Sequence, residues 1–325
     1  METPRASTAR VNEARPERTL RLRDLRPATW RTVIVNSGHR FVKDNCLDWA
    51  AALTYYGVLA LFPSLIVIVA LVGLVSDGER TVDTVVELAD EVGAGAVVGN
   101  EGFIEIVNGV VNQQSSAGVL LSFGLVAAVW SASGYVRAFA RAANAIYGVE
   151  EGRPFYKLQP QQLGLTAAGL VLLALVATML IVSGPVADFV GDALGLGQAP
   201  RTAWGLFKWP VLVAIVVLLL TLLFWIAPNV RQPRFRWLAV GGAVTLLLWA
   251  VASVGFGTYV AYFGSYDVTY GSLGAVIAFL VWMYLTNLAV MLGVEINAEV
   301  QRGRARQAGE PDPSDPVLPA RTPAE

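Results

Sequence analysis

The sequence predicts an all-α membrane protein that crosses the bilayer six times, with an amphipathic helix before the first span and a helical connection on the periplasmic side. Composition is the first observation: 55% of the 325 residues are hydrophobic and 15% are charged, which is too apolar for an ordinary soluble domain. The second is that six uncharged stretches of at least 22 residues separate the charged side chains. A helix needs about 20 apolar residues to cross about 30 Å of hydrocarbon, so each stretch is long enough.

The spans divide the chain into a membrane domain and two tails. The uncharged stretches cover residues 49–76, 106–136, 158–187, 209–230, 237–266 and 268–294. Within them, the spans are expected at about 50–76, 117–136, 163–184, 207–227, 237–258 and 272–295. They form a membrane domain at 29–300, between a basic tail at 1–28 and a proline-rich tail at 301–325. Both tails are polar and are expected to be disordered in the cytoplasm.

The distribution of basic residues predicts the orientation. With an even number of spans, 21 of the 24 lysines and arginines fall on one side, and only Arg80, Arg201 and Lys208 fall on the other. The connection at 77–105 on that other side carries eight acidic residues. Positively charged segments near membrane spans tend to stay on the cytoplasmic side. We therefore expect a bacterial inner-membrane protein with both termini in the cytoplasm.

Two segments outside the spans have apolar residues at helical spacing. Residues 29–48 place apolar side chains beside basic ones, which predicts a helix lying at the cytoplasmic membrane interface. Its apolar residues are Trp30, Val33, Ile34, Phe41 and Val42. Residues 77–116 contain two short amphipathic patterns separated by glycines. They are expected to form two helices that cap the bundle on the periplasmic side.

The first span contains a proline near its middle. Pro63 has no amide hydrogen and its ring clashes with the carbonyl of Leu59, so a kink is expected. Tyr55 and Tyr56 lie on the cytoplasmic side of this kink. They are interpreted either as anchors at the membrane interface or as part of a polar pathway beside the kink.

Polar residues gather at the expected cytoplasmic ends of spans one, two and six. Such groups are costly near hydrocarbon, so they form the candidate site. They are Asp48, Arg137, Arg141, Asn144, Glu295, Asn297 and Glu299. Helical spacing puts the two arginines and Asn144 on one face and the two glutamates on another. We expect at least one carboxylate among Asp48, Glu295 and Glu299 to pair with Arg137 or Arg141. The cluster either locks the helix ends or forms a gate or headgroup site.

Several short motifs resemble one family of bacterial inner-membrane proteins. They are Asp48 with Ala50-Ala51-Ala52-Leu53-Thr54-Tyr55-Tyr56, Leu61-Phe62-Pro63, Asn144-Ala145-Ile146-Tyr147, Pro228-Asn229-Val230-Arg231, Tyr270-Gly271-Ser272-Leu273-Gly274 and Gly293-Val294-Glu295-Ile296-Asn297. Together they are similar to the YihY/BrkB family, once named ribonuclease BN. The resemblance implies six membrane helices and supplies no established reaction.

The residues argue against the nuclease activity in that older name. Metal-dependent RNA cleavage needs clustered histidines and carboxylates that hold catalytic ions. The sequence has one histidine, His39, and no Walker loop, Gly-x-Ser-x-Gly elbow or Cys-x-x-Cys pair. The basic N-terminal tail lacks the interleaved aromatic residues on which single-stranded nucleic acid stacks. We expect no enzymatic activity, no metal or other cofactor, and no nucleic-acid partner.

Two classes of function are compatible with these features. The first is a transporter or lipid translocase with an anionic or lipid-like substrate, which the kinked first span, the tyrosines and the polar cluster favour. The second is a non-transporting envelope scaffold or membrane-integrity protein. Membrane lipids surround the chain in both cases. A transporter needs a cavity that opens to a leaflet or to water and has polar lining, whereas a scaffold can be packed throughout.

Overall fold

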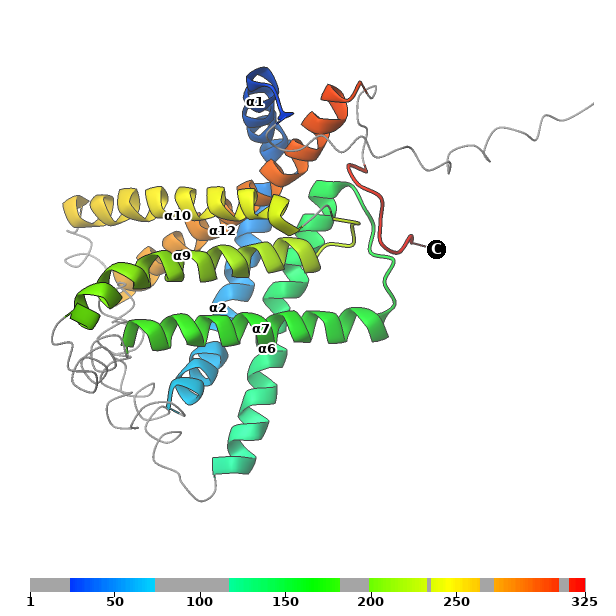
Figure 1. Cartoon of the computed structure of the whole chain (residues 1–325). Coiled ribbons are helices and arrows are strands. Elements are labelled where there is room, and N and C mark those ends of the chain that lie inside the picture. The colour runs from blue at the N-terminus through cyan, green and yellow to red at the C-terminus, as the bar shows by residue number, and fades with distance from the viewer. Residues whose placement is uncertain are drawn as a thin grey trace, which may run out of the picture.

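The computed structural model describes residues 24–73, 117–181, 199–232, 235–263, 272–309 and 316–324, and within these ranges the regular structure is helical apart from one isolated β-bridge. The described helices are α1 (Pro27–Lys43), α2 (Cys46–Gly73), α6 (Ala117–Tyr147), α7 (Phe155–Ile181), α9 (Ala199–Ile226), α10 (Phe235–Phe263) and α12 (Ser272–Gln307) (Figure 1). The all-α prediction is thus confirmed for these residues. The expected helical connection at 77–116 lies outside them.

Four of the described helices are long and apolar enough to cross a membrane. These candidate spans are Phe155–Leu180 in α7, Leu206–Ile226 in α9, Leu238–Val260 in α10 and Val276–Gln307 in α12. They coincide with the third to sixth spans expected from the sequence. In α2, the residues that the structure describes in full form a shorter apolar helix, Cys46–Leu61. By length and composition, the chain is therefore a membrane protein with several apolar helices.

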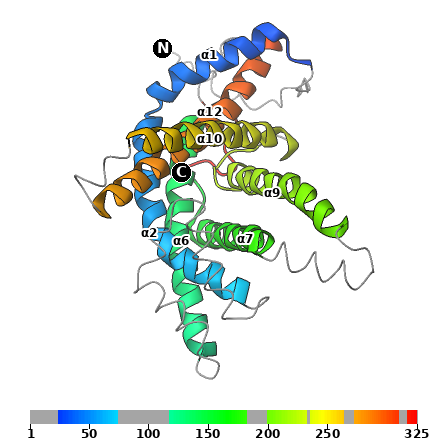
Figure 2. The same ribbon diagram turned by 90° about the vertical axis from the view of Figure 1, so that its left-hand side faces the viewer.

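The helices pack in a ring. α2 lies against α6, both contact α7, and α9, α10 and α12 follow in order until α12 returns to α2 and α6. In both views α7 and α9 lie side by side with α10 beyond them, and α2 and α6 run steeply across this layer (Figures 1 and 2). The ring brings the first, second and last long helices together, although they are far apart in the sequence.

α2 remains an α-helix through Pro63. Its ribbon changes direction in the second half of the helix in both views (Figures 1 and 2). A proline inside a helix removes one amide hydrogen and crowds the preceding turn, which is a common cause of such a bend.

The core lies where α2, α6, α9 and α12 meet. Ala138, Ala142 and Ala143 of α6 are buried there, and such small side chains allow helices to approach closely. Phe139 of α6 stacks on Phe224 of α9 with ring centroids 5.8 Å apart. The core therefore joins helices that come from both halves of the chain.

A chain of hydrogen bonds crosses this core and links three helices. The hydroxyl of Tyr135 donates to Oδ1 of Asn287 over 2.8 Å, and Nδ2 of Asn287 donates to Oγ1 of Thr54 over 3.1 Å. The hydroxyl of Thr54 in turn donates to the carbonyl oxygen of Ala50 over 2.8 Å. Because unpaired polar groups are costly inside a membrane protein, this series of hydrogen bonds holds α2, α6 and α12 in one register.

α10 and α12 approach each other through two glycines. Gly241 of α10 faces Asn297 of α12, and Gly293 of α12 faces Thr245 of α10. A Cβ atom at either glycine would overlap the facing side chain. Asn297 therefore belongs to the seam between α10 and α12, where it is buried.

α1 packs on α12 and leads directly into α2. Pro27 begins the helix, a position where its missing amide hydrogen is no loss. Val33 is fully buried beside Val300 of α12. Asn45 connects α1 to α2 with φ at 53°, a left-handed conformation that asparagine tolerates better than most residues.

Beyond residue 300 the structure differs from the disordered tail expected there. α12 continues to Gln307, and residues 316–324, here called the C-terminal segment, are hydrogen-bonded to the ends of α6 and α9. Proline-rich composition favoured disorder, but the bonds that hold this segment come from parts of the chain distant in sequence. Of the N-terminal tail, residues 1–23 lie outside the described ranges, and Leu25 is buried.

Candidate functional site

Arg137 and Arg141 lie on one face of α6, and both contact aromatic rings. The guanidinium of Arg137 is 5.7 Å from the ring centroid of Trp130, and that of Arg141 is 5.8 Å from the ring centroid of Tyr56. Gly134 lies beneath them, because a Cβ atom there would be 3.4 Å from the Tyr56 ring and 3.8 Å from the Arg137 guanidinium. We call these five residues the arginine–aromatic site.

Neither arginine forms an ion pair with a carboxylate among the residues that the structure describes. The expectation that Asp48, Glu295 or Glu299 pairs with one of these arginines is therefore wrong. Asp48 is exposed in the first turn of α2, where a negative charge complements the helix dipole. Arg137 is half-buried and Arg141 is exposed. Their charged groups are balanced by aromatic faces and remain accessible to an anion.

Glu295 and Glu299 instead pair with arginines of α12 and α1. Arg302 is fully buried and its guanidinium lies 3.3 Å from Oε1 of Glu295 and 2.9 Å from Oε1 of Glu299. Arg40 of α1 reaches Glu299 over 3.2 Å, and Arg306 reaches it over 3.5 Å. Both glutamates are fully buried. This buried ion cluster holds α1 against α12, which is a structural role.

Asn144 joins a third set of contacts, at the connections that follow α6 and α9. Its Nδ2 donates to Glu151 over 3.1 Å, and its Oδ1 accepts a bond from the amide of Asn229 over 2.7 Å. Arg153 clamps both oxygens of Glu151 and donates to the carbonyl oxygen of Ala227 over 2.8 Å. Partial burial acts to raise the pKa of Glu151, but the hydrogen bonds and charge of Arg153 outweigh it, so that pKa is lowered.

Tyr55 is 62% exposed and meets Tyr56 edge-on at a centroid distance of 5.4 Å. Tyr56 therefore lies between an exposed ring and the Arg141 guanidinium. Trp130 is also exposed. The aromatic part of the site consequently faces the surroundings of the helices rather than the packed core.

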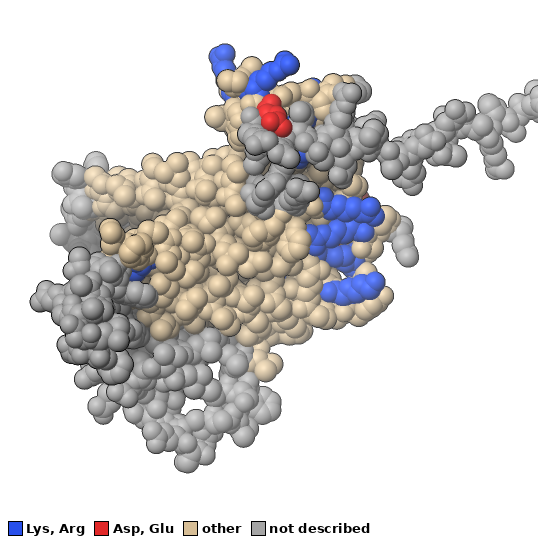
Figure 3. Space-filling model, in the orientation of Figure 1, with Lys and Arg blue, Asp and Glu red and all other residues tan. Residues whose placement is uncertain are grey.

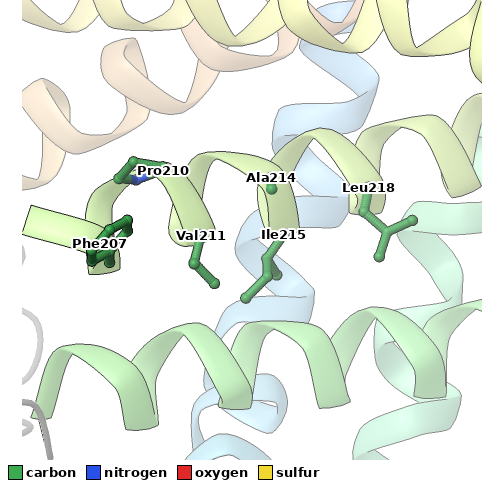
Figure 4. A pocket seen from close by; sticks show the side chains of 6 residues that line it. All are labelled: Phe207, Pro210, Val211, Ala214, Ile215 and Leu218. Carbon is green, nitrogen blue, oxygen red and sulfur yellow. The ribbon is translucent and has the colours of Figure 1, made fainter. Parts of the chain in front are cut away.

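The side of α9 that faces α7 carries an apolar groove of about 320 Å³. It is lined by Phe207, Pro210, Val211, Ala214, Ile215 and Leu218 (Figure 4). The side chains of Val211, Ile215 and Leu218 point toward α7 (Figure 4). Its lining suits a hydrocarbon chain and offers no ligand to a water-soluble ion.

Lys and Arg side chains gather at the end of the molecule where α7 begins and the C-terminal segment lies (Figure 3). Lys157 in the first turn of α7 and Arg231 in the connection that follows α9 are exposed. The structure thus brings together basic residues that the sequence placed on one side of the membrane.

Several residues that build these clusters are not among those expected from the sequence. Arg302 could have been found, because it follows Glu299 by three positions and Glu295 by seven on one helix face. Glu151 and Arg153 are two positions apart in a connection, where no helical period applies. Arg40 reaches Glu299 from another helix, and no local pattern predicts that contact.

The comparisons with known proteins identify the family. Residues 38–316 match the sequence profile of a family described as virulence factor BrkB. The chain belongs to the BrkB family. This confirms the resemblance drawn from the short motifs, and the matched range includes the described helices α2, α6, α7, α9, α10 and α12 and the arginine–aromatic site.

Named relatives support this membership. The chain is 33% identical over 250 residues to the ribonuclease-like protein YfkH of Bacillus subtilis, covering 77% of this chain and 88% of that protein. It is 30% identical over 275 residues to the UPF0761 membrane protein RC1_0578 of Rhodospirillum centenum, covering 84% of this chain. It spans only 58% of the length of that relative. No solved structure matches the chain.

Proposed function

We propose that this BrkB-family chain binds an anionic, lipid-like molecule at the arginine–aromatic site and moves it across the membrane. The observation that carries the proposal is the pair of arginines on α6 that contact Trp130 and Tyr56 and no described carboxylate. Arginine in or beside a membrane is costly, so an accessible arginine without an ionic partner favours a functional role. The proposal assigns no enzymatic reaction, cofactor or nucleic-acid partner to the chain.

The geometry of the two guanidinium groups suits a phosphate-bearing headgroup. Each guanidinium presents a planar set of donors that can bind phosphate oxygens in pairs. Arg137 and Arg141 are one helical turn apart on α6, so both can reach one headgroup. Gly134 lies one turn before Arg137, and a Cβ atom there would contact both the Tyr56 ring and the Arg137 guanidinium.

The surroundings of the site favour an amphiphile over a free ion. Exposed Trp130 lies against Arg137 and exposed Tyr55 lies against Tyr56, and such amphipathic rings are typical of the membrane interface. On another helix, α9, the groove described above is lined by apolar side chains. These features are those expected for a molecule that has a charged head and a hydrocarbon tail.

A six-span bacterial inner-membrane topology with cytoplasmic termini completes the proposal. α2 and α6 supply the first two spans, α1 lies at the cytoplasmic interface, and exposed Ile34 and Val42 of α1 face the lipid. The basic end of the molecule is then cytoplasmic (Figure 3).

Cysteine labelling tests this topology. In a Cys46→Ala background, Asn100→Cys should react with a membrane-impermeant maleimide in cells with a permeabilised outer membrane, and Glu150→Cys should not. Glu150 is exposed and therefore reports access, whereas a side chain at Gly152 would collide with Pro323. The opposite labelling pattern would contradict the orientation.

Lipid movement in proteoliposomes tests the function itself. The wild-type chain should accelerate transfer of fluorescent phosphatidylglycerol between leaflets, and the Arg137→Gln/Arg141→Gln variant should be slower by about tenfold or more. Each lost charge-assisted bond is worth about 1.5–3 kcal/mol, and about 1.4 kcal/mol corresponds to a tenfold change in rate. Asp48→Asn is the control, because Asp48 lies outside the site and should leave the rate unchanged.

Equal transfer in protein-free and protein-containing vesicles would contradict the proposal. The result would favour the scaffold alternative, which has its own support in the structure. The buried ion cluster and the bonded C-terminal segment fix the helix ends that carry them, as a scaffold requires.

A further inference from the structure

The C-terminal segment crosses the connection that follows α9 as an extended strand. The amide of Arg231 donates to the carbonyl oxygen of Pro319 over 2.9 Å, and the amide of Arg321 donates to that of Asn229 over 3.0 Å. These bonds flank an antiparallel β-bridge between Val230 and Ala320. The contact is made by main-chain groups, as when an extended peptide adds to an exposed strand edge.

The side chain of Asn229 binds the backbone of this segment. Its Nδ2 donates to the carbonyl oxygen of Thr322 over 2.7 Å, and its Oδ1 accepts a bond from the amide of Thr322 over 3.2 Å. Nδ2 also donates to the carbonyl oxygen of Glu150 over 2.9 Å. Asn229 is fully buried. A carboxamide that is anchored on one side and paired with both polar groups of a residue on the other is built to hold peptide backbone.

Further contacts hold the C-terminal segment in place. The amide of Val317 donates to the carbonyl oxygen of Tyr147 over 3.1 Å, and Val317 packs against the core. Arg321 donates to the carbonyl oxygen of Val230 over 2.7 Å and to that of Trp225, carbonyl groups at and just beyond the C-terminus of α9. A Cβ atom at Gly152 would overlap the backbone of Thr322 and Pro323. The missing side chain of Gly152 therefore makes room for the segment.

The segment itself is only partly covered. Its residues are intermediate or exposed, whereas Asn229 and Val230 beneath it are fully buried. A segment held by surface hydrogen bonds and little apolar burial opens at a lower free energy than the helices it rests on. The residues that contact the segment lie within the range matched by the BrkB profile. That range ends at 316, the first residue of the segment.

We propose that Tyr147, Gly152, Asn229 and Val230 form a binding site for an extended peptide, here called the tail site, and that the C-terminal segment is its reversible ligand within the same chain. Tethering keeps the ligand at a high local concentration, so the site is occupied unless the segment is displaced. Displacement would free the ends of α6 and α9 without unfolding them. The proposal is independent of the proposed lipid transport.

Cleavage of the folded full-length protein tests this proposal. A protease recognition sequence is inserted between residues 310 and 315, and the purified protein is cut in detergent. The freed segment should stay bound through gel filtration and should exchange with an added fluorescent peptide of residues 316–325. A competing peptide with Arg321→Ala should displace it at least about tenfold less well, because two bonds from a charged donor are lost.

Gly152→Ala and Gly164→Ala make a matched pair of variants in the cut protein. Gly152→Ala should release the segment on cleavage, whereas Gly164→Ala should retain it, since a Cβ atom at Gly164 meets nothing within 4 Å. Equal loss of the segment from both variants and from the wild type would show that no specific site exists. A freed segment that no concentration of peptide displaces would show a fixed part of the fold, and would equally overturn the proposal.

Discussion

Arg302→Ala should remove most of the folded protein from the membrane. Arg302 is fully buried and is shared by Glu295 and Glu299, and it also donates to the carbonyl oxygen of Ile146 over 3.1 Å. Its loss leaves two buried carboxylates with fewer partners. Removing one member of a buried ion pair typically costs about 3–5 kcal/mol, and the whole stability of a domain is about 5–15 kcal/mol.

The comparison variant for this prediction is Arg304→Ala. Arg304 lies on the same helix and is partly exposed, and the polar and ionic contacts of partly exposed arginines contribute little to stability. Its replacement should leave the yield and thermal stability of the detergent-purified protein nearly unchanged. Adding Glu295→Gln to Arg302→Ala should recover part of the loss, since one stranded charge is removed. If Arg302→Ala were as abundant and heat-stable as Arg304→Ala, the buried cluster would not hold α12 as described.

The helices that the sequence predicted well are those determined by the composition of a single continuous stretch of residues. An uncharged stretch such as 209–230 must be helical in hydrocarbon, because only a helix satisfies its own backbone within one segment. α7, α9, α10 and α12 follow directly from such stretches. Their order around the ring does not, because apolar faces that meet lipid and apolar faces that meet other helices have the same composition.

The partners of the charged residues were not predicted correctly from the sequence. At least one carboxylate among Asp48, Glu295 and Glu299 was expected to pair with an arginine of α6. Glu295 and Glu299 instead pair with Arg302, which lies on their own helix and reaches both. Proximity along one helix fixes that contact before any tertiary packing. The pairing of Arg141 with the ring of Tyr56 joins α6 to α2 and depends on how those helices pack.

The C-terminal segment was misjudged for a related reason. Its proline-rich composition from Pro311 to Pro323 led to an expectation of disorder, whereas residues 316–324 form an extended segment with main-chain hydrogen bonds. Extended is not the same as disordered. Asn229 and Tyr147 supply its bonding partners from positions far away in the sequence.

Replacing both arginines of the arginine–aromatic site should weaken binding of an anionic headgroup strongly. Each guanidinium makes charge-assisted bonds worth about 1.5–3 kcal/mol, so the Arg137→Gln/Arg141→Gln variant should bind about 100-fold more weakly or worse. Lysine at both positions keeps the charge without the planar donor pair, and should give an intermediate loss. Lys208→Gln is a suitable control, because Lys208 lies on α9 and contacts Trp209 rather than this site.

The most direct test of the central claim is an equilibrium titration of the purified protein with fluorescent phosphatidylglycerol in neutral detergent, alongside phosphatidylcholine. Wild type and Lys208→Gln should bind phosphatidylglycerol more tightly than phosphatidylcholine, and Arg137→Gln/Arg141→Gln should lose that preference while keeping its thermal stability. An unchanged preference for the anionic lipid in the double variant would contradict the assignment of Arg137 and Arg141 as a headgroup site.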